Sequence, residues 1–137
     1  MSTKCPCGSG KSFSECCERL HKGEPATSPE ELMRSRFAAF AVKNIDYVRK
    51  TTDPQALGEF DEAGTKEWAD TSEFFKLEIL SASNEGNKGT VEFKAHFRTD
   101  GKEHVHHEIS KFRKHQGTWY FRDGRVIIPN PPAGGPS

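Results

Sequence analysis

The sequence predicts an α+β protein in which helices pack on one face of a curved antiparallel sheet of about four strands, behind a small cysteine-rich segment. Three observations carry this prediction. All four cysteines lie within the first 17 residues. A helical pattern with a clear start signal follows them, and from Phe74 onward apolar residues recur at every second position. With 137 residues, the chain has room for one domain and a small appendage.

Composition and charge exclude several classes of function. Lys plus Arg and Asp plus Glu both number 20, so the net charge is zero, which argues against a bulk electrostatic nucleic-acid binder. The longest apolar run, from Phe37 to Val42, is far too short for a membrane span. The chain runs from Met1 into the cysteines without an apolar signal segment. We therefore expect a cytoplasmic protein without membrane contact, whose cysteines act as metal ligands or redox groups.

The crowded cysteines predict a metal site. Two close pairs joined by a short turn can supply four tetrahedral ligands to Zn²⁺. Four protein ligands close the coordination sphere, so we expect one structural zinc rather than a catalytic one. The segment has only Phe13 and Leu20 as large apolar side chains, so burial alone cannot fold it. The predicted ligands are Cys5, Cys7, Cys16 and Cys17.

Three other interpretations of the cysteines remain open at this point. Two disulfides would need an oxidising compartment, and a bridge between the neighbours Cys16 and Cys17 would be strained. A redox pair is conceivable, but Cys5 and Cys7 lack the C-x-x-C spacing of thioredoxin-type motifs. His21 could replace Cys17 as the fourth ligand, because it lies one helical turn further along. Structural zinc is the preferred interpretation.

The run Cys-Pro-Cys-Gly-Ser-Gly-Lys, with a Cys-Cys pair that begins after eight residues between Cys7 and Cys16, resembles the SEC-C zinc motif. That motif occurs at the C-terminus of the bacterial translocation ATPase SecA and in many small proteins. The resemblance implies a zinc-binding knob over residues 1–22 that contacts other macromolecules, including the export chaperone SecB and, in some relatives, the ribosome. We expect its partner-binding surface to comprise Lys4, Lys11, Phe13 and Arg19. A homodimer also remains open.

A helical region follows the knob. Residues 23–28 contain a glycine and a proline and are predicted to be a linker. Ser28 as N-cap, a proline after it and Glu31 at N3 form a strong helix start. An apolar stripe follows, and we expect the helix to end near Asn44. A second short helix is predicted over Ile45–Thr51, before an Asp-Pro break.

The remaining chain predicts a meander of strands. Between residues 55 and 72 the pattern supports only one or two helical turns. Asp100-Gly101 and Gln116-Gly117 are hairpin turn signals. The Pro/Gly-rich segment 129–137 is predicted to be a disordered tail. The four predicted strands are Phe74–Ser83, Thr90–Arg98, residues 103–114 and Thr118–Asp123.

A second resemblance covers most of the chain. The matching segments are Glu31–Phe37, Gly89–Phe93, His107–Phe112 and Gly117–Tyr120. They resemble the YchJ-like family, whose members join a SEC-C motif to an NTF2-like (cystatin-like) cone domain. The resemblance implies such a cone over residues 29–128, with no clear family pattern over 55–72, and it carries no established biochemical role.

Polar residues beside the apolar pattern suggest a pocket. Arg34 and Arg36 flank the helix stripe on opposite sides, and they could reach a cavity mouth or an anionic ligand. His106, Glu108 and Ser110 share one strand face, where Glu108 could act as a base and a histidine as an acid. The structural interpretation, boundary arginines that pair with sheet carboxylates such as Glu108, is preferred. We assign no catalytic residue.

The leading functional hypothesis is a non-enzymatic zinc-binding module that docks to a protein or ribosomal partner through its knob. The competing hypothesis is a small-molecule-binding or enzymatic cone, with a pocket lined by Arg34, Arg36, His106 and Glu108. The fold cannot decide between them, because NTF2-like domains host both catalytic and structural members. The presence of a cavity that Glu108 faces would favour the second hypothesis.

Overall fold

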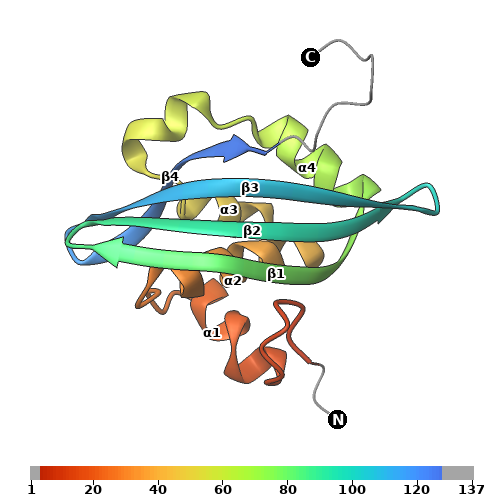
Figure 1. Cartoon of the computed structure of the whole chain (residues 1–137), viewed down its shortest axis with the longest axis horizontal. Helices are drawn as coiled ribbons and strands as arrows, with labels where there is room; N and C mark the ends of the chain where they lie inside the picture. Colours follow the sequence, from red (N-terminus) through yellow and green to blue (C-terminus); the bar gives the residue numbers. More distant parts are fainter. Residues whose placement is uncertain (1–3, 128–137) are drawn as a thin grey trace.

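The computed structural model describes residues 4–127 and shows one four-stranded antiparallel sheet with helices packed against it (Figure 1). The strands follow one another in the order β1-β2-β3-β4, which confirms the predicted α+β meander. They are β1 (Glu73–Glu85), β2 (Lys88–Thr99), β3 (Lys102–His115) and β4 (Thr118–Val126). The predicted tail at 129–137, and residue 128 of the predicted domain, lie outside the described residues.

The hairpin turns follow directly from local sequence. Asp100 and Gly101 have φ values of 53° and 77°, and Gln116 and Gly117 have 52° and 81°. Two consecutive positive φ angles are typical of the type I′ turn that joins tightly twisted strands. All four strands are longer than the alternation of apolar and polar residues predicted. Pairing between strands continues into strand ends that carry charged residues, such as Glu85 opposite Lys88.

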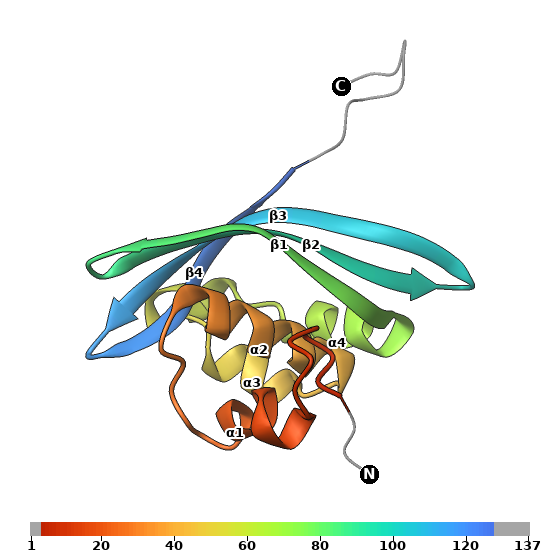
Figure 2. The same cartoon turned by 60° about the horizontal axis from the view of Figure 1, so that its bottom comes forward.

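All helices lie on one face of the curved sheet (Figure 2). They are the 3₁₀ helix η1 (Phe13–Glu15), α1 (Cys17–His21), α2 (Pro29–Ala41), α3 (Ile45–Lys50), the 3₁₀ helix η2 (Pro54–Glu59) and α4 (Glu62–Thr71). The inward side chains of β2, Val91, Phe93 and Ala95, are buried under the α2 residues Leu32 and Phe37. This layer forms the core. None of the helices in residues 4–127 is long and apolar enough to cross a bilayer.

The start of α2 forms as predicted. The Ser28 hydroxyl accepts a hydrogen bond from the Glu31 backbone N–H at 3.1 Å, and the Glu31 carboxylate reaches back to the Thr27 N–H at 2.7 Å. The helix ends at Ala41, before the expected Asn44, because the Asn44 side chain caps the next helix instead. That helix, α3, ends at Lys50, one residue before the predicted end.

The region 55–72 is more helical than predicted. It contains η2 and the ten-residue α4, where we expected one or two turns. Asp61 caps α4 through its contact with the Gly64 N–H at 2.9 Å, and Trp68 packs edge-on against Phe40 and Phe74. These aromatic contacts come from elements distant in sequence. A prediction from local helix propensity alone therefore gave too short a helix.

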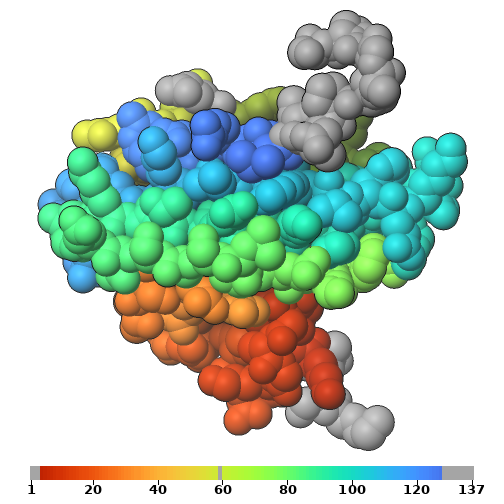
Figure 3. All heavy atoms as spheres, viewed as in Figure 1, coloured from red at the N-terminus to blue at the C-terminus, as the bar shows by residue number. Residues whose placement is uncertain are grey.

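The N-terminal segment is docked on the domain and extends beyond the edge formed by β1 (Figure 3). Cys5, Cys7 and Cys17 are buried together with Ala38 of α2. A Cβ placed on Gly8 would lie 3.9 Å from the Leu77 carbonyl oxygen of β1. The knob therefore rests against both a helix and the sheet edge.

Candidate metal centre

The structure brings the four cysteine sulfurs together. All four Sγ atoms lie within 4.8 Å of one another. The Cys7 Sγ is 3.6 Å from that of Cys16, which in turn is 3.9 Å from the Cys17 Sγ. Cys5, Cys7 and Cys17 are buried and Cys16 is half-buried. Four soft donor atoms this close together can hold one metal ion.

Local backbone geometry builds this cluster. The Cys5 N–H donates to the Lys11 carbonyl at 2.9 Å, and the Gly8 N–H donates to the Cys5 carbonyl at 3.2 Å. Gly8 and Gly10 have φ values of 84° and 87°, which side chains rarely adopt, so the tight return of the chain requires glycine at both positions. The turn places the first cysteine pair opposite the second pair at the start of α1.

Hydrogen bonds among the thiols and their burial shift the pKa values of the cysteines in opposite directions. A hydrogen bond from the Cys17 thiol lowers the pKa of Cys7 to about 4. The same hydrogen bond raises the pKa of Cys17, and burial raises that of Cys5 to about 11. Ionising every thiol would place several negative charges within a few ångströms, which a bound metal cation would neutralise.

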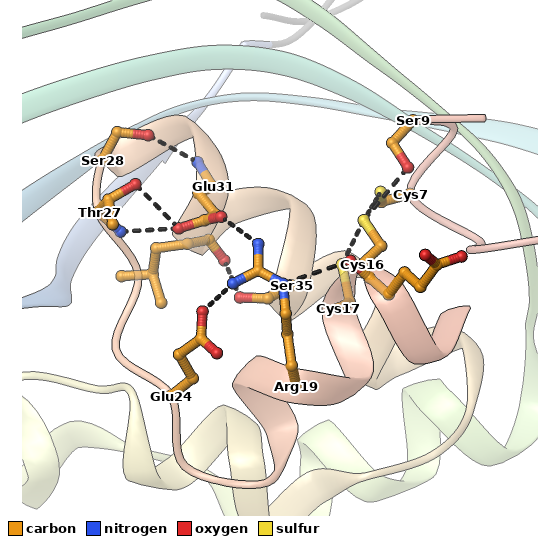
Figure 4. A network of polar contacts seen from close by, with 12 residues as sticks. Cys7, Ser9, Cys16, Cys17, Arg19, Glu24, Thr27, Ser28, Glu31 and Ser35 are labelled. Atoms are coloured by element: carbon orange, nitrogen blue, oxygen red, sulfur yellow. Dashed lines mark hydrogen bonds and ion pairs between the residues drawn. The ribbon is translucent and has the colours of Figure 1, made fainter. Parts of the chain in front are cut away.

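Contacts around the sulfurs come from the knob and from α2. The Ser9 hydroxyl lies 3.2 Å from the Cys16 Sγ (Figure 4). Arg34 donates to the Cys7 carbonyl at 2.8 Å and pairs with Glu30 at 3.0 Å. The prediction that Arg34 lines a cone pocket is therefore wrong. The side of α2 that carries Arg34 faces the knob.

The four residues predicted to bind a partner have different environments. Lys4 and Lys11 are exposed. Phe13 is half-buried, with its ring centroid 5.6 Å from that of His21. Arg19 forms ion pairs with Glu24 and, at 2.8 Å, with Glu31 (Figure 4).

The residues of the predicted linker are tied down by neighbouring polar groups. Glu24 pairs with Arg19, and the Thr27 N–H donates to Glu31. Ala26 is buried in the main core. This segment thus fixes the knob to the start of α2.

His21, the alternative fourth ligand, points away from the sulfurs. Its Nε2 lies 2.8 Å from the Ser35 carbonyl oxygen, and its ring centroid lies 4.4 Å from that of Tyr47, with the two rings tilted by 43°. Burial lowers the pKa of His21, which favours a neutral ring that donates to this carbonyl. His21 is outside the group of side chains that could share a metal.

The other predicted pocket residues do meet in the cone. Arg36, His106, Glu108 and Ser110 line one cavity of about 110 Å³. The Glu108 carboxylate accepts hydrogen bonds from the Ser110 hydroxyl and from His106 at 2.7 Å. Arg36 is buried and donates instead to the Val48 carbonyl at 3.0 Å. The expected direct pair of Arg36 with Glu108 is absent from the ion pairs of residues 4–127.

Comparison with known proteins agrees with this architecture. The family model for the SEC-C motif matches residues 1–19, and the model described as YchJ, middle NTF2-like domain, matches residues 28–124. A UPF0225 protein of Geobacter sulfurreducens is 47% identical, over 96% of this chain and 84% of that protein.

Two solved structures of SEC-C motif containing proteins are similar to this one over most of the chain. A SEC-C motif containing protein from Rhodopseudomonas palustris is 47% identical with a TM-score of 0.84, covering 90% of this chain and 98% of the other. A second SEC-C motif containing protein, from Psychrobacter arcticus, is 29% identical with a TM-score of 0.80, covering 93% of this chain and 84% of the other. With both family models and these relatives matching, the chain belongs to the YchJ (UPF0225) family of SEC-C proteins with an NTF2-like domain.

Proposed function

We propose that this protein is a non-enzymatic zinc-binding module whose knob docks to an anionic surface of a protein or of the ribosome. The observation that carries the proposal is the cluster of four cysteine sulfurs within 4.8 Å. Four protein ligands leave a tetrahedral metal no open position for substrate or water, so the metal would order the chain rather than catalyse a reaction.

The sulfur geometry suits zinc in particular. A tetrahedron with Zn–S bonds of about 2.3 Å has sulfur–sulfur edges of about 3.8 Å. Two of the distances here are 3.6 and 3.9 Å. Four thiolates with one Zn²⁺ carry a net charge of −2, which nearby Lys4, Lys11 and Arg34 can partly offset. Thiolates of this kind persist in a reducing compartment, which supports a cytoplasmic location as part of this proposal.

Docking would use the outer surface of the knob. Lys4 and Lys11 are exposed there, whereas Phe13 packs against His21 within the knob and Arg19 pairs with Glu31 of α2. A segment held rigid by a metal loses little conformational freedom on binding, which favours affinity. In this proposal the two lysines contact the partner, while Phe13 and Arg19 keep the surface in place.

Charge reversal tests the docking surface. The variant Lys4→Glu/Lys11→Glu should retain its zinc and bind purified ribosomes, or a partner identified by cross-linking in cells, at least about tenfold more weakly than the wild type. The matched control is Lys88→Glu/Lys102→Glu, which changes the net charge equally at exposed positions on two hairpins. Co-sedimentation and quantitative cross-linking provide the measurement. Equal binding by both variants would contradict the docking proposal while leaving the metal site intact.

A further inference from the structure

The cone encloses a cavity that the metal site does not use. Its volume is about 110 Å³, and it lies between α2, α4 and the helix-covered face of the sheet. This is smaller than the apolar cavity of about 150 Å³ that is known to hold benzene, so the space has room for one small ring at most. The aromatic side chains around it are Phe37, Phe40, Trp68, Phe74, Phe93 and Phe121.

One end of the cavity is polar. The Glu108 carboxylate is mostly buried there and accepts hydrogen bonds from His106 and Ser110. Burial alone would raise the pKa of Glu108, but these hydrogen bonds and the charge of Arg36 outweigh it and hold the pKa below its usual range. A carboxylate held ionised in this way is a weak base and a good hydrogen-bond acceptor. The polar end is therefore suited to binding rather than to proton transfer.

Arg36 supplies a donor to the same cavity. Its hydrogen bonds to residues within 4–127 run through Nη1 alone, to the Val48 carbonyl and, at 2.7 Å, to the Thr51 hydroxyl. Its guanidinium carbon lies 4.4 Å from the centre of the Phe121 ring, which fixes the plane of the group. Because Arg36 and Glu108 line the cavity without pairing directly, a ligand group can contact both of them.

We propose that this cavity binds a neutral molecule with a single aromatic ring and a hydroxyl group, with the ring among the aromatic side chains and the hydroxyl between Glu108 and Arg36. A hydroxyl can donate to the carboxylate and accept from the guanidinium at the same time. Arg36 and Glu108 carry opposite charges, so a charged ligand would meet one attractive and one repulsive group, and it would still lose its hydration on entering the aromatic cavity. This binding site goes beyond the proposed docking function, because it involves neither the metal nor the knob surface.

The neighbouring strand leaves space for the carboxylate. A Cβ on Gly124 of β4 would collide with the Glu108 carboxylate group. Glycine at this position therefore leaves room for the carboxylate where it accepts both hydrogen bonds, and a larger residue would require the Glu108 side chain to move.

Three simple probes test the proposal on the full-length, metal-loaded protein: phenol, toluene and benzoate. Isothermal titration and ¹⁵N-resolved NMR should show saturable binding of phenol, with amide shifts around the cavity. Toluene and benzoate should each bind at least about tenfold more weakly than phenol, because toluene lacks the hydroxyl group and benzoate carries a charge. Absence of saturable phenol binding would overturn the proposal, and so would toluene or benzoate affinity equal to that of phenol.

Variants then locate the site. Glu108→Gln should weaken phenol binding about tenfold and leave toluene unchanged, since a hydrogen bond to a charged acceptor is replaced by a neutral one. Ala95→Leu should fill the cavity and abolish binding of both. The control for Glu108→Gln is Glu103→Gln, which changes an exposed residue of the same strand, β3. Each variant is first checked by NMR for an unchanged fold, and phenol binding that survives in a folded Ala95→Leu protein would place the site elsewhere and refute the assignment.

Discussion

Replacement of Cys7 by serine is expected to remove the metal and to unfold the knob. Cys7 is fully buried, and its sulfur contacts that of Cys16 at 3.6 Å. A serine hydroxyl is a poor ligand for a soft metal site, so we expect metal affinity to fall by more than about 100-fold. This is more than the loss expected when a residue that only hydrogen-bonds a ligand is removed. Because the knob packs on Ala38, the free energy of unfolding should fall by about 3 kcal/mol or more.

Metal content, amide exchange across residues 4–22 and chemical denaturation measure these effects. The control is Ser14→Ala, which changes an exposed side chain in the same segment and should alter stability by less than about 0.5 kcal/mol. If Cys7→Ser kept the metal and the amide protection of the wild type, the four-sulfur site would be refuted.

The second large effect is expected at Asp53, a fully buried carboxylate that directly precedes η2. Its two oxygens accept hydrogen bonds from the Arg113 guanidinium of β3 at 2.5 and 2.8 Å. Its backbone N–H donates to the Phe121 carbonyl of β4 at 2.8 Å. This one residue therefore ties the start of η2 to two strands.

The variant Asp53→Asn should destabilise the protein by about 2 kcal/mol, because it removes the buried charge that accepts two hydrogen bonds from the partly exposed Arg113. Urea denaturation measures the loss. Asp46→Asn is the matched control. It breaks an exposed pair with Lys50 and should cost less than about 1 kcal/mol. Equal stabilities of the two variants would show that the buried pair contributes nothing beyond a surface pair.

At low pH, the difference in the free energy of unfolding between the wild type and Asp53→Asn should disappear. The hydrogen bond from Arg113 lowers the pKa of Asp53 from 3.8 to about 2. The unfolded chain therefore binds the proton more readily than the folded one, and the contribution of Asp53 to stability is complete above about pH 4 and is lost as the pH falls towards 2. The stability gap between wild type and Asp53→Asn should shrink over that range. Acid release of metal affects both proteins alike, so a gap that stayed constant would contradict this account.

Local signals account for the parts that sequence predicted well. The spacing of the cysteines and their intervening glycines predicts that the sulfurs come together, and Ser28 and Glu31 start α2 through contacts within a few residues. The turn pairs at Asp100 and Gln116 adopt the positive φ values that set the strand register. Each of these features depends on neighbours in the chain.

Long-range contacts decided the rest. Asp53 and Arg113 are 60 residues apart, and nothing in the sequence pairs them. Trp68 orders α4 through rings from α2 and β1. Arg34 and Arg36 were correctly placed on opposite sides of one helix, but only the tertiary structure shows that the first faces the knob and the second the cavity.

Zinc K-edge X-ray absorption, combined with metal analysis of the protein purified under reducing conditions, tests the central claim most directly. The account predicts one zinc per chain with four sulfur neighbours at about 2.3 Å and no nitrogen neighbour. Metal-free protein with disulfides, or a spectrum that requires a histidine ligand such as His21, would contradict it.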